Sequence, residues 1–487
     1  MVATAPVGFI ALQRFGLGAR PGDLEAIAAD ARDAVLAEIG PDSALIENST
    51  LPDTVSAISA VRDLQMARKA AKAAAPQPGD SATADDAAPD MTSDLAPDMA
   101  TPGRKGKARK PPRGAADANT PGNPLAPEMA ARLAQAVAAR VGFAERWAMF
   151  WTNHFAVEAD SNQLVRWTVG AFDREAIRPH VFGRFEELLF AVTQHPAMLR
   201  YLNNASSIGP DSKAGLQQNK GLNENHAREL MELHTIGVDA GYTQADVIAV
   251  AKVLTGWTFG QNPRQAERFA RFFFNPRTHE PGAQTVLKAV YAQPGEKQGD
   301  AVLAMLAGHS ATATHIAGKL VRHFVADTPP PELVGAIAAV FDQSGGDLAQ
   351  VAKALLTADA AWSAPMQKLR LPQEYLLAAA RGLGVTPKPP QLLKALATLG
   401  QPLFNPPSPE GFHDDAATWL APDAMTNRLD IAQNFAQQAD ASADARQVAD
   451  ALLGEAQSAA TREAVARAES PVQGLTILLM SPEFQRR

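Results

Sequence analysis

Acidic, imidazole and guanidinium side chains are concentrated in one segment near the middle of the chain, residues 221–237. The segment reads Gly-Leu-Asn-Glu-Asn-His-Ala-Arg-Glu-Leu-Met-Glu-Leu-His-Thr-Ile-Gly, so its polar groups are interleaved with core-forming side chains. Burying polar groups is unfavourable unless they bond to one another or to a ligand. A carboxyl group beside an apolar wall has a raised pKa and can act as an acid. The chemistry expected here is general acid–base catalysis, with Glu224, Glu229 and His234 as catalytic candidates.

A second cluster lies upstream in residues 145–155, which read Glu-Arg-Trp-Ala-Met-Phe-Trp-Thr-Asn-His-Phe. His154 is the preferred proton carrier, because a free imidazole titrates near neutral pH. Asn153 and Trp151 are binding candidates, because an amide beside an aromatic ring offers a platform on which a sugar ring can stack. The alternative is that these rings belong to the core.

Further binding candidates surround the two clusters. Arg228 is suited to hold an anionic or polar substrate group, and Trp257 adds aromatic surface. Asn223 and Asn225 flank Glu224, and Asn223 can cap the free amides of the helix that follows. Two carboxylates with aromatic walls favour a glycan substrate over a peptide.

The element that must position the central cluster is a helix over residues 223–236. At about 100° per residue, one face of this helix is shared by His226, Leu230, Leu233 and His234. Glu229 lies at the margin of that face. Arg228 and Glu232 lie on the opposite side, four residues apart, and are predicted to pair. Gly237 is suited to end the helix.

Apolar periodicity predicts a mainly α fold: an irregular multi-helix globular domain over residues 126–487, with an N-terminal helical lead over residues 1–65 packed on it. The strand pattern at 268–274 and 285–290 predicts one minor β-hairpin. Residues 66–125 are rich in Ala, Pro, Asp, Gly and Lys. Such a segment buries too little apolar surface to offset its conformational entropy, so we expect a long disordered insertion.

Composition excludes several classes of protein. The 487-residue chain is 46% hydrophobic and 20% charged, which is ordinary for a globular protein. Its net charge of −7 argues against a nucleic-acid partner, which would require a basic face. No apolar run reaches the length of a membrane span. The chain has no cysteine, which excludes thiolate metal sites and a Cys nucleophile.

Several motifs resemble those of the bacterial family called domain of unknown function 1800. They are residues 14–22 (Arg-Phe-Gly-Leu-Gly-Ala-Arg-Pro-Gly), 150–155 (Phe-Trp-Thr-Asn-His-Phe), 223–237, 254–257 (Leu-Thr-Gly-Trp) and 400–407 (Gly-Gln-Pro-Leu-Phe-Asn-Pro-Pro). The resemblance covers nearly the whole chain apart from the insertion. The family pattern has an apolar or aromatic residue in place of His226. It is matched at Asn153, His154, Asn223, Glu224, Asn225, Arg228, Glu229, Glu232 and His234.

The resemblance implies a helical fold and no particular reaction. It also implies a periplasmic or exported location, because members of the family often look exported. The start of the chain, in contrast, lacks the basic stretch and long apolar run of a signal peptide, which predicts a cytoplasmic location. Both locations stay open.

We favour a hydrolase or lyase that acts on a small-molecule or glycan ligand through Glu224, Glu229, His154 and His234. The alternative is a non-catalytic binding or assembly protein, in which the polar helix is a buried structural network. A metal site built from His154, His234 and Glu229 is a weaker alternative. No metal or other cofactor is predicted, because the chain lacks HExxH and related motifs.

Overall fold

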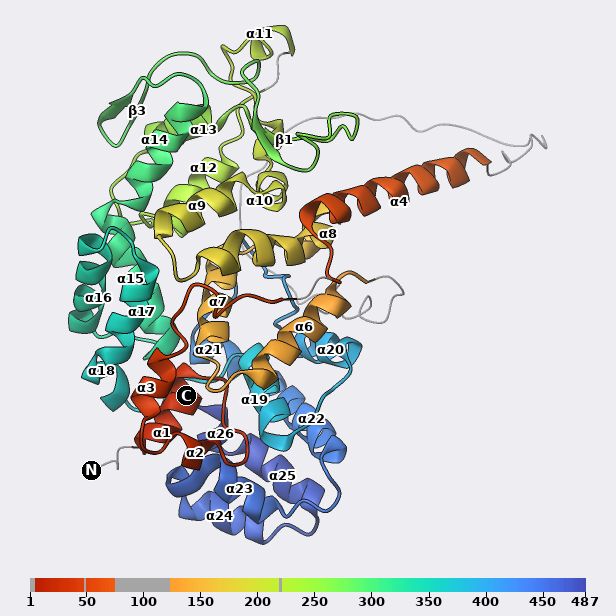
Figure 1. Cartoon of the computed structure of the whole chain (residues 1–487), viewed down its shortest axis with the longest axis vertical. Helices are drawn as coiled ribbons and strands as arrows, with labels where there is room; N and C mark the ends of the chain where they lie inside the picture. The colour runs from red at the N-terminus through yellow and green to blue at the C-terminus, as the bar shows by residue number, and fades with distance from the viewer. Residues whose placement is uncertain (1–4, 48–49, 75–122, 219–220) are drawn as a thin grey trace, which may run out of the picture.

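The computed structural model describes residues 5–47, 50–74, 123–218 and 221–487. Over these residues the chain forms an elongated, mainly α-helical molecule (Figure 1). This confirms the predicted fold class. Residues 75–122, the greater part of the predicted disordered insertion, lie outside the described residues.

The N-terminal lead is helical and packs on the rest of the molecule. It consists of α1 (Val7–Ile10), the π-helix η1 (Ala11–Phe15), α2 (Asp23–Ala26), α3 (Ala31–Leu36) and α4 (Thr54–Ala74). α3 contacts α17 (Leu348–Thr357), and α4 contacts α8 (Gln163–Phe172). α4 extends beyond residue 65, the predicted end of the lead, because its continuation is rich in the good helix formers Ala, Arg and Lys.

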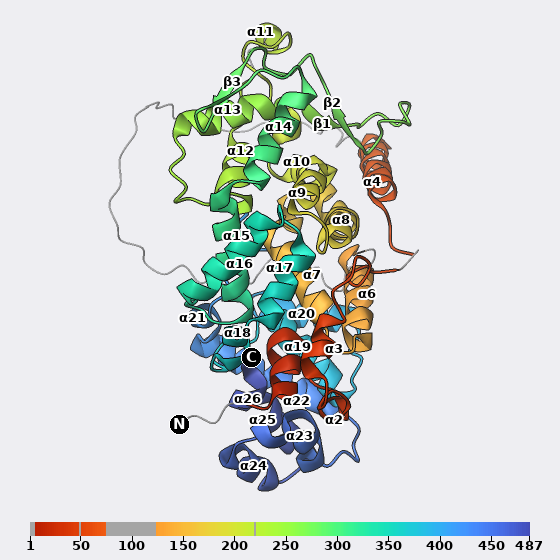
Figure 2. The same ribbon diagram turned by 60° about the vertical axis from the view of Figure 1, so that its left-hand side comes forward.

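The remaining helices are distributed along the long axis of the molecule, from one end to the other. The upper end in Figure 1 contains α9 (Phe185–Gln194), α10 (Pro196–Tyr201), α11 (Gly215–Gln218), α12 (Asn225–Glu229), α13 (Gln244–Leu254) and α14 (Glu296–Ala307). The middle contains α6 (Leu125–Ala138), α7 (Phe143–His154), α8, α15 (Ser310–Phe324), α16 (Pro331–Gln343), α17 and α18 (Asp359–Ser363). α20 (Pro389–Thr398) and α21 (Ala416–Trp419) also lie at this middle level. The lower part contains α19 (Pro372–Leu383), α22 (Pro422–Gln438), α23 (Ala445–Leu453), α24 (Ala459–Ala466), α25 (Pro471–Met480) and α26 (Pro482–Gln485). Both views place α7 between the two ends (Figures 1 and 2).

The two predicted strand segments are present, but they do not pair with each other. β1 (Trp257–Phe259) pairs antiparallel with β2 (Phe272–Phe274), and β3 (Gln284–Val286) pairs antiparallel with β4 (Ala289–Tyr291). The residues between β3 and β4, Leu287 and Lys288, have φ values of 48° and 68°. Two consecutive residues with positive φ make a tight hairpin turn, so β3 folds back on β4 and leaves β2 to pair with β1.

Within the described residues, three helical stretches widen into π-helices, namely η1, η3 (Asp173–Ile177) and η6 (Leu230–His234). Each of them holds a buried polar side chain: Arg14, Asp173 and His234, respectively. A π-turn accommodates one extra residue and is frequent at functional sites. The helix predicted over residues 223–236 is therefore α12 followed by η6, and Leu233 on its predicted apolar face is only half-buried.

α7 is buried along almost its whole length, including the adjacent charges Glu145 and Arg146. Arg178, in the 3₁₀ turn η4 (Arg178–His180), donates hydrogen bonds of 2.7 and 2.8 Å to the Glu145 carboxylate. The same guanidinium donates a 2.6 Å hydrogen bond to Asp173. Arg132 of α6 completes the group, with its Nη2 atom 2.5 Å from Asp173. Because buried charges are tolerated when each has a partner, this ion cluster fixes α6, α7 and η3 against one another.

Replacing Arg178 with methionine tests this cluster. The substitution leaves two buried carboxylates with one guanidinium between them, so we expect a loss of about 3–5 kcal/mol in the free energy of unfolding. Chemical denaturation measures the loss. The matched control is Arg467→Met, which removes an exposed ion pair to Glu463 and is expected to change stability by less than about 1 kcal/mol. Equal effects of the two substitutions would contradict the role of the cluster.

Candidate functional site

The two polar clusters of the sequence meet at His154 and His234. His154 ends α7 and His234 ends η6, and their ring centroids are 6.1 Å apart. The Nε2 atom of His154 lies 3.2 Å from the backbone oxygen of His234. Because a carbonyl oxygen only accepts, the ring proton of His154 is assigned to Nε2 and Nδ1 keeps a free lone pair. Within the described residues that Nδ1 atom has no hydrogen-bond partner.

Two further groups reach His154 from α15. The ring centroid of His315 lies 6.4 Å from that of His154, and its Nε2 atom lies 3.2 Å from the backbone oxygen of Leu233. Lys319 follows one helical turn later and is half-buried. In the part of the chain that the structure describes, its ammonium group makes no hydrogen bond or ion pair. Sequence reasoning missed both residues, although their i,i+4 spacing on an amphipathic helix was a signal.

Burial controls the protonation of these groups. It lowers the pKa of Lys319 to about 8, with Glu410 opposing the shift and Arg322 adding to it. Burial and then Lys319 hold the pKa of His154 well below its usual range. At neutral pH the lysine is therefore close to its titration point, whereas the imidazole of His154 is neutral.

His154 and Lys319 line a pocket of about 300 Å³, which we call the His154 pocket. Its other lining residues are Phe150, Asn153, Arg322, Asp327, Glu410, Phe412, His413, Asp414 and Asp415. Charges of both signs and two phenylalanine rings face the same space. Such a lining suits a polar ligand that also has an apolar face.

Asp414 connects the pocket to the protein interior. The Nδ1 atom of His323 lies 2.5 Å from Asp414 Oδ2, and the ammonium group of Lys368 lies 3.2 Å from Oδ1. Burial alone would raise the pKa of Asp414, but His323, Lys368 and Arg487 hold it well below its usual range. Glu374 of α19 lies behind them, and its ion pairs with Arg146 and Arg487 lower its pKa to about 2 against the effect of burial. Asp414 is consequently a permanent, oriented negative charge at the pocket wall.

Asn153, predicted to bind ligand, holds one wall of the pocket in place. Its Oδ1 atom accepts a 2.8 Å hydrogen bond from the Phe412 amide, and its Nδ2 atom donates a 3.0 Å bond to the Phe412 carbonyl. The preceding Gly411 has φ +92°, and a Cβ atom there would lie 2.5 Å from the Asn153 backbone oxygen. Asn153 therefore acts on the pocket through the loop that carries Phe412 and Asp414.

The predicted catalytic carboxylates lie outside the His154 pocket. The Glu224 carboxylate is 3.3 Å from Arg228 Nη2 and accepts a 2.7 Å hydrogen bond from Gln244. The predicted pair Arg228–Glu232 is confirmed, at 3.4 Å. Glu229 is half-buried, and burial followed by the Glu232 charge raises its pKa. Glu224, Arg228 and Glu232 form a mutually bonded set that does not line the His154 pocket, and Glu229 lies outside the pocket as well.

The other residues that the sequence indicated for a site lie in the core or at the start of α12. Trp151 and Trp257, predicted to bind ligand, are 0% exposed, and neither lines the His154 pocket. The Asn223 side chain accepts a 2.9 Å hydrogen bond from the Asn225 amide, the first amide of α12, although the N-cap position itself is occupied by Glu224. His226 is buried, and within the described residues neither of its ring nitrogens has a partner. The metal set of His154, His234 and Glu229 is not assembled: across the described ranges, no three His, Asp or Glu side chains converge as metal ligands would.

Buried histidines make the stability of the fold depend on pH. Burial lowers the pKa of His226, and burial with the Lys319 charge lowers that of His315, from 6.5 to about 4 in each case. The unfolded chain therefore binds more protons than the folded chain between these values, and stability is lost as the pH falls from about 6.5 towards 4. We expect a lower denaturation midpoint at pH 5 than at pH 7. His226→Leu should reduce this difference, and an unchanged difference in that variant would contradict the assignment.

Comparison with known proteins identifies a family and no closer relative. No curated protein and no solved structure matches the chain. Nor does any helix in the described residues combine the length and apolarity needed to cross a membrane. The family model described as "Protein of unknown function (DUF1800)" matches residues 10–486, which include every residue of the His154 pocket. The chain therefore belongs to the DUF1800 family of proteins of unknown function.

Proposed function

We propose that the protein is a hydrolase or lyase that works by general acid–base catalysis in the His154 pocket. The observation that carries the proposal is the pairing of two unpartnered groups in one pocket, the Nδ1 lone pair of His154 and the ammonium group of Lys319. A buried nitrogen without a partner, such as Nδ1 of His154, is rare in proteins unless it has a function. Together the two groups supply a proton acceptor and a proton donor.

The two groups have complementary roles at neutral pH. The His154 imidazole is neutral and accepts a proton from water or from a substrate carbon. Lys319, with a pKa of about 8, is mostly protonated and donates a proton to the leaving group. Asp414 stays ionised and stabilises positive charge that develops during the reaction. Removal of one proton and delivery of another is the shared requirement of hydrolytic and eliminative cleavage.

A glycan is the substrate class that this lining favours. The pocket volume of about 300 Å³ is at the lower end for small-molecule sites and accommodates a sugar-sized group. Phe150 and Phe412 offer apolar faces, while Glu410, Asp415 and Arg322 offer hydrogen-bonding partners for hydroxyl groups. Phe412 here takes the role that the sequence had indicated for Trp151.

The alternative is a non-catalytic binding or assembly protein. It is favoured by the mutual bonding of the polar helix residues, in which Arg228 pairs with Glu224 and Glu232, and Tyr242 donates a 2.6 Å hydrogen bond to Glu232. In that case these side chains maintain the packing of α12 on α13 and take no part in a reaction.

Substitution of Lys319 tests the catalytic proposal. On a polysaccharide or glycoside that wild-type protein cleaves in a substrate panel, Lys319→Met should lower kcat by about 10²–10⁴-fold, because the general acid is lost. Lys353→Met, at an exposed lysine of α17, is the matched control and should keep full activity. Full turnover in a folded Lys319→Met protein would end the proposal.

The pH profile gives an independent check. We expect kcat/KM to fall above pH 8, because Lys319 loses its proton there. Activity should persist below pH 6.5, since the pKa of His154 lies well below that value. An activity that rises steadily from pH 7 to pH 10 would contradict these roles.

The variants Glu224→Gln and Glu229→Gln distinguish the catalytic proposal from the non-catalytic alternative. If the protein is an enzyme acting in the His154 pocket, both variants should retain kcat, because these carboxylates lie outside the pocket. If the polar helix has only a structural role, the expected result is a lower melting temperature with no catalytic activity in the wild-type protein. Thermal denaturation and the activity panel are measured on the same preparations.

A further inference from the structure

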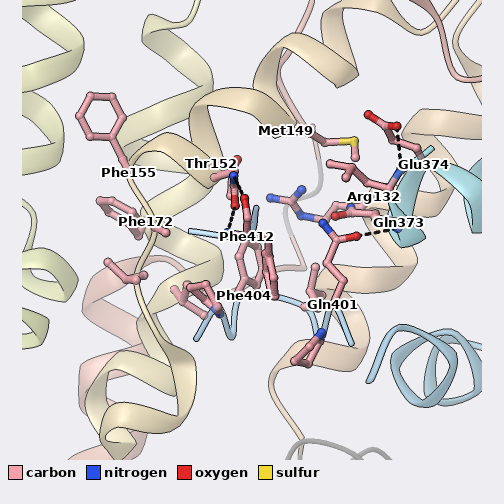
Figure 3. A pocket seen from close by; sticks show the side chains of 18 of the residues that line it. Arg132, Met149, Thr152, Phe155, Phe172, Gln373, Glu374, Gln401, Phe404 and Phe412 are labelled. Carbon is pink, nitrogen blue, oxygen red and sulfur yellow. Dashed lines mark hydrogen bonds between the residues drawn. The ribbon is translucent and has the colours of Figure 1, made fainter. Parts of the chain in front are cut away.

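A second hollow lies beside the His154 pocket, between α6, α7, α8 and the loop that precedes α21 (Figure 3). The two spaces share Asn153 and Phe412 as lining residues, and these two residues are hydrogen-bonded to each other. The walls of the hollow are mainly apolar and include Met149, Phe155, Val169, Phe172, Phe404 and Phe412. Its volume is about 60 Å³. That exceeds the ~10–15 Å³ that one water requires and is less than half of the ~150 Å³ that admits benzene. The hollow therefore has room for a short group and not for a ring.

Two hydrogen-bond donors at one side of this hollow have no partner in the described part of the chain. They are Nε of Arg132, a side chain only 1% exposed, and Nε2 of Gln373. Figure 3 shows both side chains on the side opposite Phe155 and Phe172. A group that fills the hollow would thus meet donors at one end and aromatic rings at the other.

The charge at the donor end is already balanced. Glu374, which also lines the hollow, is paired with Arg146 and Arg487. Arg132 and Arg178 are the two cations of the buried ion cluster, and Glu145 and Asp173 are its two anions. An added carboxylate or phosphate would have no counterion and would be costly to bury. A neutral acceptor such as a carbonyl oxygen would satisfy the free N–H groups without this cost.

The wall that closes the hollow is held in an unusual conformation. Phe404 has φ +52°, a region that non-glycine residues rarely occupy. Its carbonyl oxygen accepts a 2.8 Å hydrogen bond from the Ala159 amide, and its ring lies 4.5 Å from the Arg132 guanidinium carbon. Asn405 accepts a 2.9 Å hydrogen bond from the Asp160 amide. Backbone conformations of this kind persist where surrounding contacts enforce them, commonly at binding sites.

We propose that this hollow binds a short neutral acyl group of the size of acetyl. The carbonyl oxygen would accept hydrogen bonds from Arg132 and Gln373, and the methyl group would lie among the phenylalanine rings. The rest of an acylated ligand would extend past Asn153 into the His154 pocket, a step that rests on the proposed function. The natural substrate is then an acylated glycan. Binding of the acyl group itself does not depend on any reaction.

N-methylacetamide is the probe, and saturation-transfer NMR on the whole protein measures its binding. Wild-type protein should give a signal that acetate does not displace, because the site is neutral. Val169→Leu fills the hollow and should weaken binding at least tenfold. Val165→Leu is the matched control, since Val165 is equally buried on the same helix but does not line the hollow, and it should bind normally.

Gln373→Met is the second variant. It removes one donor without breaking any internal side-chain hydrogen bond in the described residues, because Nε2 is unpartnered. It should weaken binding about fivefold, the factor that corresponds to one neutral hydrogen bond. Unchanged binding in both Val169→Leu and Gln373→Met would place the probe elsewhere and overturn the proposal. Absence of a wild-type signal would mean that the hollow holds water only, and would also overturn it.

These outcomes are separate from those of the catalytic proposal. A wild-type protein that is active on glycans but does not bind N-methylacetamide overturns the acyl site alone. A protein that binds the probe in the expected manner but cleaves no substrate of the panel overturns the catalytic proposal alone.

Discussion

Two adjacent buried charges on α7, Glu145 and Arg146, constrain the rest of the structure. Neighbouring side chains on a helix point about 100° apart, so the two charges reach different surroundings. Glu145 is bonded to Arg178 at 2.7 Å, and Arg146 lies 3.2 Å from Glu374 of α19. Any rotation or sliding of α7 would leave a buried charge unpaired, at a cost of several kcal/mol. His154, at the end of the same helix, is thereby fixed in position.

The polar pocket lies where this internal ionic network approaches the surface. From Arg146 the network runs through Glu374 and Arg487 to Asp414, which lines the His154 pocket. The site thus has one rigid ionic wall and one wall of α15, from which Lys319 projects without a partner. Of the ionisable groups that line the pocket, Asp327, Asp414 and Asp415 are bonded within the protein. Lys319 and the Nδ1 atom of His154 have no partner in the described residues, and they are the groups to which we assign the proposed chemistry.

The smaller hollow lies on the side of α7 that is turned away from the His154 pocket. Here the balanced cluster around Arg178 supplies no excess charge, and the lining of the hollow is mainly apolar, with two unpartnered donors at one side. Asn153 lies between the two spaces and holds Phe412 by both of its backbone groups. α7 therefore lies between a charged pocket and a mainly apolar hollow. The two spaces differ because the charges on the side of the hollow are paired with one another, whereas the His154 pocket contains groups without a partner.

Local features of the site were predictable because they depend on residues close together in the chain. The helix that contains Glu229, the hydrogen bond between Asn223 and its first amide, and the Arg228–Glu232 pair follow from spacing alone. The π-turn that orients His234 was not predictable, since a regular helix has the same local pattern and the tertiary packing decides between them. The carboxylates of the same segment were assigned to catalysis because sequence does not show which side of a helix faces a pocket.

The sequence by itself determined that the protein is mainly helical, that it belongs to this family and that His154 lies in a polar and aromatic cluster. The tertiary structure alone decided that His154 meets Lys319, that Trp151 belongs to the core and that Glu224 pairs outside the pocket. The physical reason is that helix formation depends on interactions over three or four residues, whereas a pocket is made by side chains hundreds of positions apart. Burial and pairing, which set protonation, exist only after those distant segments have packed.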